Sequence, residues 1–159
     1  HDNQSFLEFV KDFFRSKYNY DTNNRFMEKT RNLAEDTAPQ NTSKDELNKY
    51  TAKLRKNPKE FIAASFAELF ASPARRIQIF FSDFWGLGKT YNRPGTTQGN
   101  WALRLDSDFE DAYYKAASEG KAPNLADAVA RALRHRGLDK GHEALMKNLD
   151  ESAKIIAEK

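Results

Sequence analysis

The segment from Ile77 to Leu105 concentrates the residues that could contact a ligand. It reads as a short apolar strand that delivers Ser82 and Asp83 at its carboxyl end, followed by a glycine-marked loop. The loop carries amide, guanidinium and aromatic side chains, namely Trp85, Tyr91, Asn92, Arg93, Asn100 and Trp101. Amides bond hydroxyl groups and aromatic rings cover apolar C–H faces, so the loop suits a sugar. The alternative is that the aromatic rings fill a core and the glycines only shape a turn.

The composition excludes several classes of protein. The 159 residues include 26 basic and 23 acidic ones, and the net charge of +3 is too balanced to indicate a nucleic-acid or membrane-surface protein. Without cysteine the chain has no disulfide, thiol nucleophile or thiolate metal site. No apolar run approaches the length that spans a membrane. Aromatic residues make up 13% of the chain, so much of the core must be aromatic.

Most of the chain is expected to be helical. Apolar residues at helical spacing predict a first helix over 6–14, a weaker one over 26–33 and a final one around Leu145 to Ile156. Capping residues predict four further helix starts, at Ser43, Asn57, Ser107 and Asn124.

One segment is predicted to be a strand. Residues 76–81 are short, β-branched and aromatic. A single strand leaves its backbone groups without partners, so we expect a partner strand elsewhere in a larger protein. The chain opens with His1 rather than methionine and shows no signal peptide. We therefore expect it to begin after processing or within a longer polypeptide.

The segment 77–105 resembles the eighth strand and following loop of the amylomaltase family, the 4-alpha-glucanotransferases or disproportionating enzymes. The family pattern begins with an apolar strand, a polar residue with Asp, and Leu-Gly or a similar pair. It continues with Asn-x-Pro-Gly, a spacer, Asn-Trp and a later Arg. The matching residues are Asp83, Gly86, Asn92, Pro94, Gly95, Asn100, Trp101 and Arg104. The opening His1-Asp2 is similar to the His-Asp pair after the family's seventh strand, and the 80 residues between Asp2 and Asp83 leave room for a helical insertion.

The resemblance implies a role for each of these residues. Asp2 would stabilise the transition state and His1 would hold the same sugar ring, because bonds that tighten in an oxocarbenium-like state lower the barrier. Asp83 would either contact the sugar or act as an acceptor that holds the loop. The donor-side loop would be shaped by Asn92, Pro94 and Gly95. It would be braced by Asn100, Trp101 and Arg104. In the family the nucleophile and the acid/base lie on the fourth and fifth strands, upstream of the His-Asp pair, and therefore outside this chain.

The expected fold is mostly α with one or two strands, as the carboxyl-terminal segment of a (β/α)8 barrel. Residues 1–105 would be the last part of the catalytic barrel, including the insertion, and residues 106–159 a helical carboxyl-terminal extension. The parent protein would move α-1,4-glucan segments between maltooligosaccharides by a retaining mechanism, and the isolated chain would be inactive. Its partners would be these glucans and the rest of the barrel upstream of His1.

Other features set limits on the function. His135 and His142 lie seven residues apart with no further ligands nearby in the sequence, so no metal site is predicted, and the resemblance implies no cofactor. Neither nucleic acid nor membrane is expected as a partner, and the expected location is cytoplasmic. Two alternative hypotheses stay open. The chain could be a non-catalytic helical module that binds carbohydrate or another partner, or a fragment of an amylase-like glycoside hydrolase.

Overall fold

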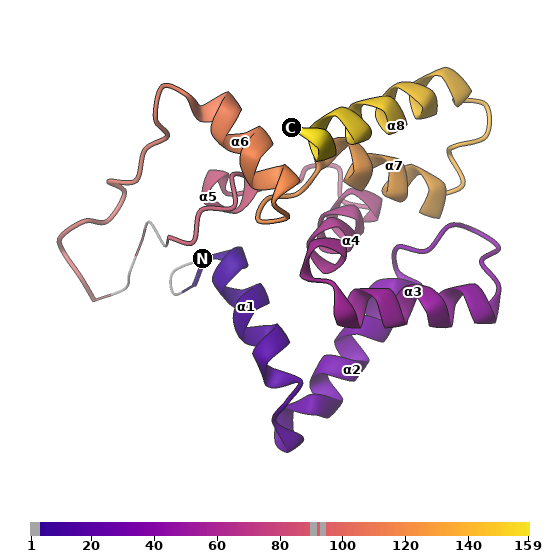
Figure 1. Cartoon of the computed structure of the whole chain (residues 1–159), viewed down its shortest axis with the longest axis horizontal. Helices are drawn as coiled ribbons and strands as arrows, with labels where there is room; N and C mark the ends of the chain where they lie inside the picture. The colour runs from indigo at the N-terminus through magenta and orange to yellow at the C-terminus, as the bar shows by residue number, and fades with distance from the viewer. Residues whose placement is uncertain (1–3, 90–91, 93–94) are drawn as a thin grey trace.

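The computed structural model describes residues 4–89, 92 and 95–159, which form helices joined by loops (Figure 1). In chain order the helices are α1 (Phe6–Ser16), α2 (Tyr20–Glu35), α3 (Lys44–Lys56), α4 (Pro58–Ala71), α5 (Phe81–Phe84), α6 (Phe109–Ser118), α7 (Leu125–His135) and α8 (Glu143–Glu158). α4 is central, because it packs against α1, α2 and α3 on one side and against α7 on the other. The long loop between α5 and α6 extends away from the helices.

The prediction of one or two strands in a barrel segment is wrong, because no strand occurs within the described residues. Residues 76–80 of the predicted strand, 76–81, have no regular secondary structure, and Phe81 begins the single turn of α5. A strand is stable only when a neighbour accepts and donates its backbone hydrogen bonds. The described chain folds its other apolar segments into helices, so residues 76–80 have no ladder to join.

Local capping residues explain where several helices begin. Ser43 accepts a hydrogen bond from the Glu46 amide while the Glu46 carboxylate accepts one from the Ser43 amide, so the predicted capping box is confirmed. Asn57 caps α4, with Pro58 in its first turn, and Asn124 caps α7, again as predicted. α1 has a capping box of the same kind, formed by Ser5 and Glu8.

Two helix boundaries differ from the prediction. α6 begins after Asp108 and no side chain caps it, so the capping box expected of Ser107 and Glu110 is absent. The helix expected over 26–33 extends from Tyr20 to Glu35. Its polar ends carry no apolar periodicity, but Thr30 is fully buried within it and donates to the Phe26 carbonyl. Packing against α3 and α4 therefore stabilises a helix that its own sequence indicates only weakly.

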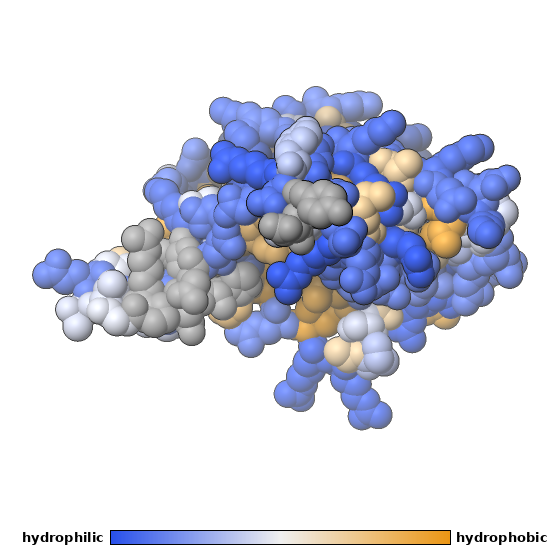
Figure 2. Space-filling view, turned by 90° about the horizontal axis from the view of Figure 1, so that it is seen from below, coloured by the Kyte–Doolittle hydropathy of each residue, from blue (hydrophilic) through white to orange (hydrophobic). Residues whose placement is uncertain are grey.

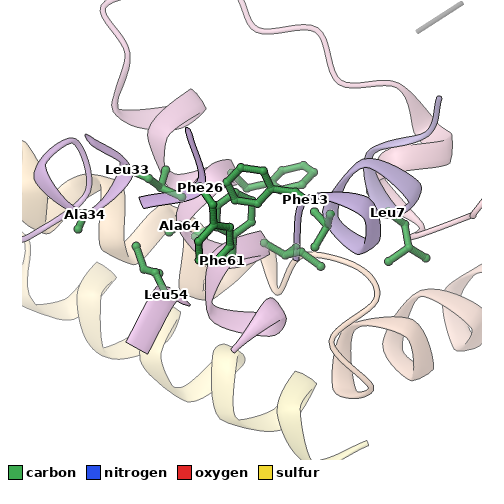
Figure 3. Packing of buried hydrophobic residues seen from close by; sticks show 12 residues of the cluster. Leu7, Phe13, Phe26, Leu33, Ala34, Leu54, Phe61 and Ala64 are labelled. Atoms are coloured by element: carbon green, nitrogen blue, oxygen red, sulfur yellow. The ribbon is translucent and has the colours of Figure 1, made fainter. Parts of the chain in front are cut away.

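The core is built from phenylalanine rings at the junction of α1, α2 and α4 (Figure 3). The Phe13 ring lies 4.9 Å from that of Phe26 and 5.0 Å from that of Phe61, centroid to centroid, and Phe14 packs edge-on against both. Aliphatic residues extend this cluster, among them Leu7, Val10, Leu33, Leu54 and Ile62. The aromatic content of the sequence is therefore largely used for packing.

The carboxyl-terminal helices are attached to the rest of the chain through α4. α4 and α7 pack against each other, and α7 carries four buried alanines, Ala126, Ala128, Ala130 and Ala132. α8 is held to α7 by a fork of two bonds from Arg134 Nη2 to the Asp150 carboxylate, at 2.7 and 2.8 Å. The domain boundary expected between residues 105 and 106 stays a prediction.

A group of charged side chains pairs where α3, α4 and α7 meet. Glu60 lies 2.8 Å from Lys53 and 3.0 Å from Arg131, and Arg131 also pairs with Asp127 at 2.9 Å. Burial opposes ionisation of Glu60 most strongly, but its bond to Lys53 and the charge of Arg131 together lower its pKa below the usual range. These pairs keep a half-buried carboxylate charged between the helices.

No described helix is both long and apolar enough to cross a membrane.

Candidate functional site

The candidate site is built around Asp83, which lies at the amino-terminal end of α1. Its carboxylate Oδ1 accepts a hydrogen bond of 2.9 Å from the backbone N–H of Phe6, although the two residues are 77 positions apart in sequence. The first amides of a helix have no partner within the helix, and their dipoles favour a negative group. Asp83 therefore acts as an acceptor, as one of the two sequence hypotheses proposed, but the bond described for it holds α1 rather than the loop.

Burial shapes the chemistry of this carboxyl group. Asp83 is only 7% exposed, and burial raises its pKa above the ordinary value, while the hydrogen bond from Phe6 acts in the opposite direction. The folded state therefore binds the proton more tightly than the unfolded state does. The stability that protonated Asp83 contributes is present at low pH and is lost as the pH rises through the raised pKa.

The Asp83→Asn variant should remove this pH dependence. Its side-chain oxygen can still accept from Phe6, but no charge is buried at neutral pH, so the variant should be at least as stable as the wild type at pH 7. From about pH 4 upwards, the wild type should lose stability where the variant does not. Urea unfolding measured between pH 4 and 7 tests this. A variant that is clearly less stable at pH 7 would show that the helix needs the carboxylate charge.

An apolar groove of about 410 Å³ opens beside Asp83. Its walls come from α1, α4 and the segment 78–80, and its apolar lining includes Phe6, Phe9, Phe66, Leu69, Ile79 and Phe80. Lys29 and Glu68 also line the groove, where they pair at 3.6 Å. The groove can therefore accept an apolar face, while Gln78, Ser65 and Asp83 supply polar groups to its lining.

The loop that follows α5 is anchored at Gly86. This residue has φ +60°, and a Cβ placed on it would lie 2.4 Å from the carbonyl oxygen of Lys121. The adjacent Leu87 amide donates to the Ser82 carbonyl at 2.7 Å. Only glycine allows both this backbone conformation and this close approach of two chain segments. The root of the loop is therefore tied to the turn between α6 and α7.

Replacing Gly86 by alanine is expected to lower the free energy of unfolding by about 2–3 kcal/mol, because a left-handed conformation and a backbone clash both oppose the new methyl group. Gly88→Ala is the matched control, since the nearest atom to its added Cβ is 3.9 Å away and the residue needs no left-handed backbone. Urea denaturation of both variants checks the difference. Equal stabilities would mean that the loop is not anchored at Gly86.

The far part of the loop is organised by hydrogen bonds to its own backbone. Asn100 Nδ2 donates to the Thr96 carbonyl at 2.8 Å, and Thr96 Oγ1 donates to Asn100 Oδ1 at 3.2 Å. Arg104 Nη1 donates to the carbonyls of Trp101 and Leu103 at 2.6 and 2.9 Å. The two bonds between Thr96 and Asn100 close a turn in which Gly95 to Gly99 are exposed.

The two tryptophans of this region have different environments. Trp85 packs against Phe84, Phe109 and Tyr113, and its Nε1–H donates to the Phe109 carbonyl at 2.6 Å. Trp101 is 62% exposed and has a left-handed backbone with φ 59°. The hypothesis that these aromatic residues fill space therefore describes Trp85 and does not describe Trp101.

The other predicted site residues are only partly covered by the structure. His1, Asp2 and Pro94 lie outside the described residues. Asn92 is half-buried, while Gly95 is exposed with φ 79° and has open space around it. Asp83 is placed against α1 by the hydrogen bond that it accepts from Phe6. Within the described ranges, no group of three or more His, Cys, Asp or Glu side chains could hold a metal ion.

Sequence reasoning missed two features of the site. The bond between Asp83 and Phe6 joins distant segments and has no local signal, although Ser5 and Glu8 have the capping-box spacing that marks the start of α1. The left-handed conformation of Trp101 also has no signal in the sequence, since a bulky residue rarely adopts it.

Comparisons with protein-family models, curated proteins and solved structures find no match for this chain.

Proposed function

We propose that this chain is part of a 4-alpha-glucanotransferase, which moves α-1,4-glucan segments between maltooligosaccharides with retention of configuration. The ordered series of residues from Asp83 to Arg104, preceded by His1-Asp2, carries the proposal. The bond between Asp83 and Phe6 supports it, because it ties the start of α1 to the root of the loop. The four residue steps from Asp2 to Phe6 span at most about 14 Å, so both segments of the motif can serve one ligand.

The proposed mechanism divides the work between this chain and other parts of the enzyme. A nucleophilic carboxylate and an acid/base carboxylic acid, both outside this chain, would cleave the glucan and hold the donor part covalently until the 4-hydroxyl of an acceptor glucan takes it. Asp2 would stabilise the positive charge that develops on the sugar ring, and His1 would bond its hydroxyls. Asn92, Pro94 and Gly95 would shape the donor side. The proposal includes no cofactor and a cytoplasmic location.

Incubation of maltotriose with the full-length protein tests this proposal. A glucanotransferase should produce glucose together with oligomers longer than maltotriose, whereas an amylase-like hydrolase should produce only shorter sugars. The 159-residue chain alone should produce neither, because it lacks both reacting carboxyl groups. Products formed by the isolated chain, or only shorter sugars from the full-length protein, would contradict the proposal.

A second candidate is a non-catalytic helical module that binds carbohydrate. The observation that favours it is the closed aromatic core, in which Phe61 and Leu54 are fully buried within an all-helical arrangement of the described residues. Calorimetric titration of the isolated chain with maltoheptaose separates the two candidates. Micromolar affinity with a cooperative thermal transition would favour the module, whereas aggregation or a molten state would favour a piece of the larger enzyme.

A further inference from the structure

We propose that the segment between α4 and α5 binds an extended acidic peptide of another protein. The peptide pairs with the backbone of residues 76–79 and places apolar side chains in the neighbouring groove, which is lined by α1, α4 and residues 78–80. This protein-binding role goes beyond the proposed sugar chemistry and does not depend on it.

The backbone of the segment is the first observation. Within the described part of the chain, residues 76–79 take part in no hydrogen bond, and Arg76, Ile77 and Gln78 are exposed. The chain has extended backbone angles on both sides, with φ −60° and ψ 154° at Ser72 and φ −72° and ψ 137° at Phe80. Solvated N–H and C=O groups beside β-branched side chains are what the edge of a sheet offers to a peptide that adds to it. The segment can therefore accept an extended peptide.

The groove beside the segment is the second observation. It holds about 410 Å³ and its lining is mostly apolar. Phe9 and Leu69 of the lining, and Ile77 next to Gln78 of the lining, are each between 38% and 42% exposed. Figure 2 shows a mostly hydrophilic face with apolar side chains gathered near its lower middle. Exposed apolar side chains that gather around a hollow mark an interaction surface. An extended peptide with an apolar residue at every second position would present one apolar face to this groove.

The charge beside the groove is the third observation. Arg75 and Arg76 are exposed, and neither has a carboxylate partner among the described residues. The charged groups of the groove itself are already engaged, since Lys29 pairs with Glu68 and Asp83 accepts from Phe6. The two arginines can therefore pair with carboxylates of a partner. A peptide that runs antiparallel to the segment has its carboxyl-terminal end opposite the arginines, so its acidic residues belong there.

A second copy of this chain fits the surface less well than an acidic peptide does. Two copies of the segment that pair antiparallel about Gln78 would place Arg76 opposite Phe80 and Arg75 opposite Phe81. The arginines would then gain no carboxylate from the partner. An acidic peptide satisfies the backbone groups, the groove and the arginines together.

Fluorescence anisotropy with the full-length protein tests the binding. The probe is a short labelled peptide that alternates threonine with valine and ends in two glutamates, and we expect a dissociation constant in the micromolar range. Arg75→Glu combined with Arg76→Glu should weaken binding at least about tenfold, and a peptide that ends in two lysines should restore it. The matched control combines Arg136→Glu with Lys140→Glu, which makes the same change of charge at two exposed residues that follow α7 and should bind like the wild type.

Methylation of the peptide tests the backbone pairing without any change to the protein. Alternate amides of an extended peptide lie on opposite edges, so two peptides are made, each with the amide nitrogens of one edge methylated. One of them should lose at least about tenfold in affinity, while the other binds like the unmodified peptide. Leu69→Lys, at the groove, should weaken binding about fivefold, whereas Leu145→Lys, at a leucine of α8 that is 48% exposed, should leave it unchanged.

Each result of these titrations decides the question. The proposal is overturned if the anisotropy does not change saturably up to about 500 µM protein, a limit above the expected micromolar range. Equal affinities of the two methylated peptides overturn it as well, and so does an arginine double variant that binds the acidic peptide like the wild type. A dimer in sedimentation velocity that the peptide does not dissociate, and that Leu69→Lys does, would assign the groove to a second copy instead.

Discussion

The Phe61→Ala variant should lose about 3–5 kcal/mol of its free energy of unfolding, a large part of what a domain of this size has. The Phe61 side chain is fully buried, with ring centroids 5.0 Å from Phe13 and 5.6 Å from Phe14. Removing the ring leaves a cavity between α1, α2 and α4, which close packing prevents from collapsing completely. The loss in the free energy of unfolding therefore has two parts. One is the favourable free energy of removing the ring's apolar surface from water, and the other is the unfavourable free energy of the cavity.

Phe9→Ala provides the matched control for this substitution. It removes the same atoms from a ring that is 39% exposed on α1, so the expected loss is about 1–2 kcal/mol. Urea unfolding of both variants measures the difference, and the slope of the transition should stay unchanged. A loss from Phe61→Ala no larger than that from Phe9→Ala would mean that the aromatic core is not where the structure places it.

The helices could be predicted because their signals are local. Each confirmed cap accepts a hydrogen bond from a backbone amide only two or three residues further along the chain. Both partners of the bond therefore lie in one short stretch of sequence, as at Ser43 with Glu46, Asn57 with Pro58, and Asn124. Ser5 and Glu8 have the same spacing and form a capping box at the start of α1. Ser107 and Glu110 show the limit, since the same spacing there makes no cap.

The strand prediction failed because a strand depends on residues elsewhere. The β-branched and aromatic residues of segment 76–81 favour an extended chain, and Phe80 near the end of this segment has extended backbone angles. Whether such a segment becomes a strand is decided by a neighbour, and none is present within the described residues. The barrel assignment depended on that strand and is wrong for the same reason.

The candidate site could be predicted only in part. The residue types of segment 77–105 mark it as a candidate site, and the structure places Asp83 of this segment, buried, against the start of α1. Which segment it would contact had no local signal, because α1 is 77 residues away in sequence. The different environments of Trp85 and Trp101 also come from tertiary packing and from the bonds of Arg104, which residue types alone do not specify.

The second large effect is expected at Asp2. The proposed function predicts that replacing Asp2 by asparagine in the full-length protein lowers kcat for the disproportionation of maltotriose by about 10²–10³-fold, because a neutral amide would not stabilise the positive charge of an oxocarbenium-like transition state. KM should change little, since the interaction is strongest in the transition state. Asp12→Asn is the matched control. This aspartate on α1 is 60% exposed, pairs with Arg15, and has no proposed catalytic role.

The rate of maltotriose disproportionation by Asp2→Asn, compared with Asp12→Asn and the wild type, tests the central claim most directly. The proposed function predicts that Asp12→Asn keeps the wild-type rate while Asp2→Asn loses at least about 10²-fold in kcat and keeps its cooperative unfolding transition. An Asp2→Asn rate within twofold of the wild type would contradict the claim that this chain supplies a catalytic aspartate to a glucanotransferase.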